Sequence, residues 1–206
     1  LDESARCDLE VMWMEGWRRS WSHDESGAPW VMPSPNMPTP STALVYPGAC
    51  LYEGTNLSEG RGTTRPFELV GAPYIEDPHR FCEDILAQGV EGVALRPCWF
   101  RPTVRKHAGQ LCGGLQMHVT DASRFRPLHA AVAVIAAARR LEGFDWYRGE
   151  YEFERGRLAI DLLFGDDQPR RALEAGAFAP EVLAPFAADE PEIRRQRAVA
   201  LYDGYE

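Results

Sequence analysis

The sequence predicts an α+β protein in which a mixed sheet packs against helices. Hydrophobic residues make up 45% of its 206 residues and charged ones 26%, which is typical of a folded globular protein. Apolar runs of strand length occur at 67–70, 93–100 and 114–120, and longer helical patterns occur at 78–88 and 125–141. Strands and helices interspersed in this way predict the α+β class.

The first forty residues differ from the rest of the chain. Residues 7–13 are apolar enough for a short strand, but no hairpin partner follows them. Residues 33–40 contain four prolines, and each proline fixes its own backbone angle and keeps its predecessor out of the helical region. We therefore predict an extended, semi-rigid connector over residues 30–40, with a domain boundary near it.

A short helix is expected after the connector, at residues 46–53, with Pro47 in its first turn. It leads into a polar loop at 54–64. The apolar segment 125–141 predicts a buried core helix that is too short to cross a membrane.

The C-terminal part predicts shorter helices, at 159–164, 169–175 and 191–202. In the last of these, three apolar residues are expected to face inward: Ile193, Ala198 and Leu201.

Charge and cysteine content exclude several functions. A net charge of −9 argues against nucleic-acid binding, which usually needs a basic face. The five cysteines are scattered without a C-x-x-C pair, so we interpret them as mostly buried thiols. The alternative is a single disulfide bridge between two of them. The five histidines are equally dispersed. The sequence therefore predicts neither a metal site nor a cofactor.

The chain shows no membrane span and no targeting signal. No run approaches the roughly 18 apolar residues of a membrane helix. The first residues lack both a start methionine and a signal-peptide pattern, which suggests a trimmed N-terminus. The sequence does not distinguish between an extracellular, a periplasmic and a cytoplasmic location.

Residues 53–67 concentrate the chemistry of the sequence. Three glycines stand among two carboxylates, two guanidiniums and several hydroxyls, a density typical of loops that surround a ligand. No lysine follows Gly60, and Gly60-Arg61-Gly62 lacks the third glycine of a dinucleotide fingerprint. Both phosphate-loop interpretations therefore fail.

Four segments together resemble the NamZ-type exo-β-N-acetylmuramidase family, formerly a domain of unknown function. They are WVMPSPNMP at 30–38, YPG at 46–48, EGTNLSEGRGTTRPFE at 53–68 and GAP at 71–73. The resemblance implies a chain of about twice this length with a Rossmann-like N-terminal domain. Residues 1–42 would then be the terminal strand and connector of that domain, and 43–206 the C-terminal α+β domain.

The resemblance also implies an activity. It is the hydrolysis of terminal non-reducing N-acetylmuramic acid from peptidoglycan fragments, at a site shared with the chain's own N-terminal domain. An isolated C-terminal region would then be inactive. The alternative is a non-catalytic carbohydrate-binding or scaffolding domain, which would bind sugar even without the N-terminal domain.

The loop supplies the candidate site residues. Glycoside hydrolysis uses two carboxyl groups, for which Glu53 and Glu59 are the local candidates. Arg61 and Arg65 are expected to bind the lactyl carboxylate of muramic acid, because a guanidinium matches a carboxylate's geometry. Sugar hydroxyl and acetamido groups are assigned to four further residues: Asn36, Asn56, Ser58 and Thr63.

Two alternatives to these assignments remain. The glutamates and arginines of the loop can instead pair with one another and hold an irregular backbone. The main catalytic carboxylate can also lie in the N-terminal half.

Overall fold

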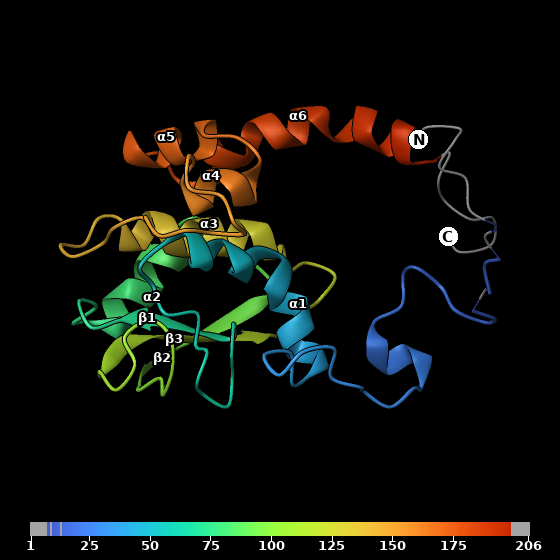
Figure 1. Ribbon diagram of the computed structural model, residues 1–206, viewed down its shortest axis with the longest axis horizontal. Helices are drawn as coiled ribbons and strands as arrows, with labels where there is room; N and C mark the ends of the chain where they lie inside the picture. The colour runs from blue at the N-terminus through green and yellow to red at the C-terminus, as the bar shows by residue number, and fades with distance from the viewer. Residues whose placement is uncertain (1–7, 9, 13, 199–206) are drawn as a thin grey trace.

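A computed structural model describes residues 8, 10–12 and 14–198, and it confirms the α+β class. One three-stranded sheet forms the first layer, and α1 (Pro40–Ala49) and α2 (Pro78–Leu86) cover it (Figure 1). α3 (Pro127–Ala138) lies over these two helices, and α4 to α6, within residues 159–198, lie beyond α3. The strands are β1 (Leu69–Ala72), β2 (Val93–Phe100) and β3 (Cys112–Val119). Their order is β1-β3-β2, and both pairings are antiparallel.

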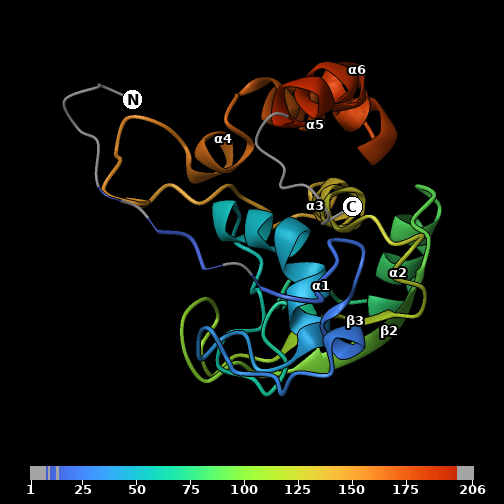
Figure 2. The ribbon, with the colours of Figure 1, turned by 90° about the vertical axis from the view of Figure 1, so that its right-hand side faces the viewer.

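The strands predicted at 67–70, 93–100 and 114–120 and the two long helices are present, with ends shifted by a few residues at most. α2 (Pro78–Leu86) begins after Asp77, whose carboxylate caps the backbone N–H groups of His79 and Arg80. α3 (Pro127–Ala138) is buried from Ala130 to Ala138. It has no polar face because it lies between α1 and α2 on one side and α5 and α6 on the other (Figure 2).

The helix expected at 46–53 begins earlier than predicted. α1 spans Pro40–Ala49, and a 3-10 turn, η3 (Cys50–Gly54), follows it. The start is set by Thr39, whose hydroxyl accepts from the Thr42 N–H at 3.3 Å, and by Pro40, whose fixed φ suits a first helical position. Pro47 consequently lies inside the helix rather than in its first turn.

The segment before α1 has only short local structure. η2 (His23–Ser26) is a single 3-10 turn capped by Ser22. Residues 30–39 form neither helix nor strand, as the connector prediction requires, but they are not fully extended, because the Met37 N–H closes a turn on the Ser34 carbonyl at 2.9 Å. The strand expected at 7–13 falls partly outside the described residues, and residues 8 and 10–12 pair with no strand.

The C-terminal helices are α4 (Ala159–Phe164), α5 (Gln168–Glu174) and α6 (Ala179–Ala198). The prediction for the last helix was wrong in its start and its inward face. Only its first turns bury residues, and the rest projects from the body (Figure 1). Ile193 is accordingly 56% exposed and Ala198 is exposed, while Leu201 lies outside the described residues.

The cysteines that the structure describes are free thiols. Cys82, Cys98 and Cys112 are buried, and Cys50 is partly buried.

Within the described part of the chain, no helix is both long enough and apolar enough to span a bilayer.

Candidate functional site

The polar loop after η3 is packed into the protein. Thr55 forms an antiparallel β-bridge with Trp146, and the Tyr147 N–H donates to the Gly54 carbonyl at 2.9 Å. Ser58 forms a second antiparallel β-bridge, with Gly71 of β1, so the loop extends the edge of the sheet. The backbone of this loop is therefore fixed on both sides by segments distant in sequence.

Four charged side chains meet at the end of this loop. The Arg61 guanidinium donates to a Glu53 carboxylate oxygen, and its Nε lies 3.2 Å from Glu59 Oε1. The Lys106 ammonium lies 3.2 Å from the other oxygen of Glu59. Glu59 is buried and Glu53 is partly exposed, so Glu53 is the more accessible carboxylate. We call these four residues the pocket cluster.

Lys106 was missed by the sequence analysis. Its ammonium also donates to the carbonyls of Tyr52 and Leu57, at 2.7 and 3.1 Å. Burial lowers the pKa of Lys106, and the neighbouring Glu59 carboxylate opposes that shift. One sequence signal was available, because Lys106 is the only lysine among 22 basic residues, and every other one is arginine.

The backbone around Lys106 is unusual. Arg105 and His107 both have left-handed φ angles, 65° and 57°, which are uncommon for residues other than glycine. The His107 imidazole compensates by bonding the Asn56 carbonyl at 2.7 Å. Two strained residues thus flank the lysine and turn its side chain toward the loop.

Tyr151 holds the remaining oxygen of Glu53. Its hydroxyl donates to Glu53 Oε2 at 2.9 Å. Burial and the adjacent Glu53 carboxylate both raise the pKa of the tyrosine, so it stays a donor. Both oxygens of Glu53 are therefore positioned by donors.

The pocket cluster lines a pocket of about 530 Å³, a volume in the range of small-molecule sites. Its lining residues come from the loop, the Lys106 segment and the segment after Trp146: Glu53, Glu59, Arg61, Arg105, Lys106, Tyr147, Glu150, Tyr151 and Glu152.

The structure brings together only three of the predicted site residues, Glu53, Glu59 and Arg61. Each of the others makes contacts outside that lining. Asn56 donates to the Gly143 carbonyl at 2.7 Å and accepts from the Tyr74 hydroxyl at 2.8 Å. The hydroxyls of Ser58 and Thr63 bond the backbone of Gly60.

Arg65 and Asn36 make their contacts with residues outside the cluster. Arg65 is 3.7 Å from the buried Glu68, which also accepts from the Thr42 hydroxyl at 2.7 Å. Asn36 donates its backbone N–H to the Ser34 hydroxyl at 3.3 Å. Neither residue lines the pocket.

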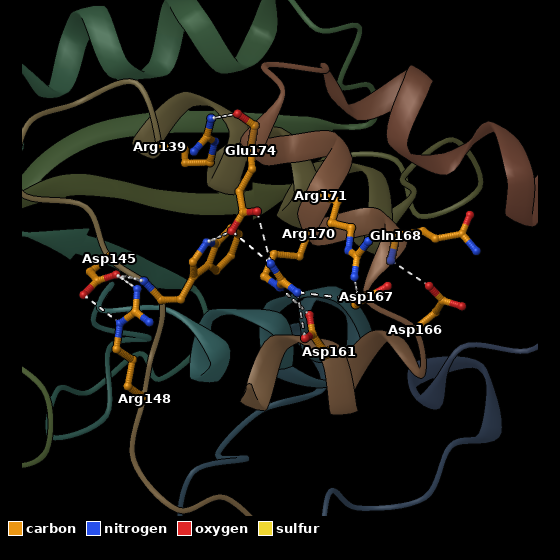
Figure 3. A network of polar contacts seen from close by, with 11 residues as sticks. Arg139, Asp145, Arg148, Asp161, Asp166, Asp167, Gln168, Arg170, Arg171 and Glu174 are labelled. Atoms are coloured by element: carbon orange, nitrogen blue, oxygen red, sulfur yellow. Dashed lines mark hydrogen bonds and ion pairs between the residues drawn. The ribbon is translucent and has the colours of Figure 1, made fainter. Parts of the chain in front are cut away.

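A second group of charged residues, which we call the Arg170 network, consists of Arg170, Asp161 and Glu174. Figure 3 shows Arg170 between Asp161 and Glu174. Its Nε and Nη2 bond the two oxygens of Asp161 at 2.7 and 3.1 Å, and Glu174 accepts from Trp146 Nε1 at 2.9 Å. The network thereby fixes Trp146, next to the pocket-lining Tyr147.

The fold and site define a class of protein: an α+β domain with a pocket lined by paired carboxylates and cations. Within that class, the chain belongs to the NamZ family. The model described as "Exo-beta-N-acetylmuramidase NamZ, C-terminal" matches residues 44–202, and the corresponding N-terminal model matches residues 2–41.

Known relatives agree with this membership. The chain is 39% identical over 180 residues to the peptidoglycan beta-N-acetylmuramidase NamZ of Bacillus subtilis. That alignment covers 87% of this chain and 42% of the relative, so the chain spans less than half of the relative's length.

Two solved structures of DUF1343 family proteins from Bacteroides fragilis are similar. One superposes with a TM-score of 0.79 at 21% identity, covering 97% of this chain and 51% of the other. The second gives 0.56 at 25% identity, covering 83% and 43%. The first, at its low identity, supports the fold alone.

Proposed function

We propose that this chain supplies one side of the active site of an exo-acting glycosidase, which removes terminal non-reducing N-acetylmuramic acid from peptidoglycan fragments. The observation that carries the proposal is the pocket cluster at the floor of a sugar-sized pocket, in a chain of the NamZ family. The other side of the site would come from an N-terminal domain. The name of the B. subtilis relative supports this substrate, and the pocket supports the binding of a sugar.

The two candidate carboxylates differ in their surroundings. Glu53 reaches the pocket with both oxygens oriented, by Arg61 and by the Tyr151 hydroxyl. We assign it the direct role, as the carboxylate that activates water or stabilises charge at the reacting carbon. Glu59 is buried between Arg61 and Lys106, so we assign it a positioning role.

The division of the chain belongs to the same proposal. Residues 1–42 would be the end of the N-terminal domain and its connector, and residues 43–206 the C-terminal domain. The separate family matches on either side of residue 42 support this division. The proton donor to the leaving group would then come from the N-terminal domain, because neither Glu53 nor Glu59 is free of cationic partners.

A complementation assay tests the proposal. Release of N-acetylmuramic acid from a chromogenic N-acetylmuramide would be measured for the 206-residue chain alone. The same assay would be run on the chain extended at residue 1 by the N-terminal domain of the B. subtilis relative. We expect hydrolysis only in the extended protein, with weak sugar binding by the chain alone.

The alternative, a non-catalytic carbohydrate-binding or scaffolding domain, predicts a different result. Sugar affinity would be the same in both proteins and neither would hydrolyse the substrate. Because a foreign domain can fail to dock, the extended protein must first show a single cooperative unfolding transition. Given that transition, absence of hydrolysis would contradict the proposal.

A further inference from the structure

Most charges around the pocket are already paired. Arg61 contacts Glu53 and Glu59, and Lys106 contacts Glu59. Glu150 is bound by Arg155, which lies outside the pocket lining. These pairs engage the cations Arg61 and Lys106, so the carboxylate of an acidic ligand must be bound by another group.

Two charged lining residues have no such partner. The guanidinium of Arg105 and the carboxylate of Glu152 make no hydrogen bond or ion pair with any described residue. Both have left-handed backbones, with φ angles of 65° and 49°. A backbone held in this region costs of order 1 kcal/mol or more for an L-residue, and such strain clusters at ligand-binding sites.

The backbone of Arg105 is fixed on both sides. After it come Lys106 and His107, which are anchored to the polar loop. Before it, Thr103 bonds the Gly62 carbonyl through its N–H at 3.1 Å and its hydroxyl at 2.9 Å. Arg105 therefore lines the pocket from a positioned segment, and because the residue is exposed, its guanidinium donors stay available.

We propose that Arg105 binds the carboxylate of the sugar ligand and so distinguishes muramic acid from neutral amino sugars. The inference rests on the proposed function and moves this role from Arg61 and Arg65 to Arg105. Arg61 is engaged by two carboxylates and lies over the Phe67 ring, 5.1 Å from its centroid. A free guanidinium offers a carboxylate two parallel hydrogen bonds.

Glu152 is expected to affect the binding of an acidic sugar in the opposite direction to Arg105. Its carboxylate lines the same pocket and repels an anion bound nearby. Removing that charge strengthens binding of an acidic sugar, whereas removing Arg105 weakens it. The two variants thus predict shifts of opposite sign.

The test compares two sugars on the 206-residue chain. N-acetylmuramic acid and N-acetylglucosamine differ by the lactyl ether, and their Kd values would be measured by NMR titration. We expect Arg105→Ala to weaken N-acetylmuramic acid binding by at least about tenfold, because the carboxylate loses its charge-assisted hydrogen bonds to the guanidinium, and to leave N-acetylglucosamine binding unchanged. Glu152→Gln should strengthen binding of the acidic sugar only.

Arg80→Ala is the matched control, since Arg80 is an exposed arginine on α2, paired with Asp84 and outside the pocket lining. It should change neither Kd. Preference for the acidic sugar that survives Arg105→Ala but is lost in Arg65→Ala would overturn the proposal. Equal binding of the two sugars by the unmodified chain would overturn it and leave the sugar site standing. Binding of neither sugar would contradict the proposed function as well.

Discussion

The pocket cluster and the Arg170 network are built from the same parts and differ in what surrounds them. Each has an arginine held between two carboxylates. Arg170 is bonded through both arms to Asp161, and the two residues lie on regular helices. Arg61 lies on an irregular loop beside strained backbone and an open pocket. Ion pairs alone do not identify a site, whereas strain and open volume beside them do.

The largest stability effect is expected in the Arg170 network. Arg170→Ala leaves the buried Asp161 without its cation, so the free energy of unfolding should fall by about 3 kcal/mol or more. Urea denaturation measures this loss. Arg194→Ala on α6 removes an exposed pair and should cost less than about 0.5 kcal/mol. Equal decreases in the free energy of unfolding for the two variants would contradict a structural role of the network.

Lys106→Met should have a somewhat smaller effect, of about 2 kcal/mol. The variant leaves Glu59 with one cation and removes the ammonium that donates to the carbonyls of Tyr52, Glu53 and Leu57. Adding Glu59→Gln should restore part of this loss, because the uncompensated carboxylate is then gone. A double variant as unstable as the sum of the two single variants would show that the two residues are not coupled.

A smaller effect is expected where the Lys106 segment meets the polar loop. Gly62 and Gly89 share a φ of 79°, but an added Cβ at Gly62 would lie 2.6 Å from the Val104 nitrogen, whereas at Gly89 it meets nothing within 4 Å. Gly89→Ala therefore costs only backbone strain, of order 1 kcal/mol. Gly62→Ala should cost about 1 kcal/mol more. Identical thermal denaturation of the two variants would mean that this contact is not tight.

The smallest effect is a pH dependence. Burial lowers the pKa of Lys106 from its ordinary 10.5, so the folded protein releases this proton at a lower pH than the unfolded chain. Between the two pKa values the unfolded state binds more protons, and stability rises with pH. The stability of wild type relative to Lys106→Met should thus increase as pH rises toward 10.5. Urea denaturation at several alkaline pH values that shows a decrease would contradict this assignment.

Much of the fold was predictable because strands and buried helices leave periodic patterns. The strand at 93–100 and the helix at 159–164 have the predicted bounds. The starts of α1 and α6 were not predicted. The cap formed by Thr39 and Pro40 was overlooked, and Pro185 and Pro191 inside α6 disfavour a helix locally.

The site was predictable only in part. The composition of the polar loop pointed to Glu53, Glu59 and Arg61, which do meet at one pocket. Lys106 and Arg105 come from some forty residues further on, and a left-handed backbone, which no periodicity reveals, positions them. Asn56, Ser58 and Thr63 carry the right chemistry, but their polar atoms bond other parts of the protein.

The central claim is that Glu53 of the pocket cluster acts on the ligand, whereas the Arg170 network serves stability. The most direct test is hydrolysis of a chromogenic N-acetylmuramide by the extended two-domain protein, comparing Glu53→Gln with Glu150→Gln. Both residues line the pocket, but Glu150 is paired outward with Arg155. We predict that Glu53→Gln lowers kcat at least about a hundredfold without loss of stability, and that Glu150→Gln changes it less than about threefold. Equal activity of Glu53→Gln and the unmodified protein would contradict the account.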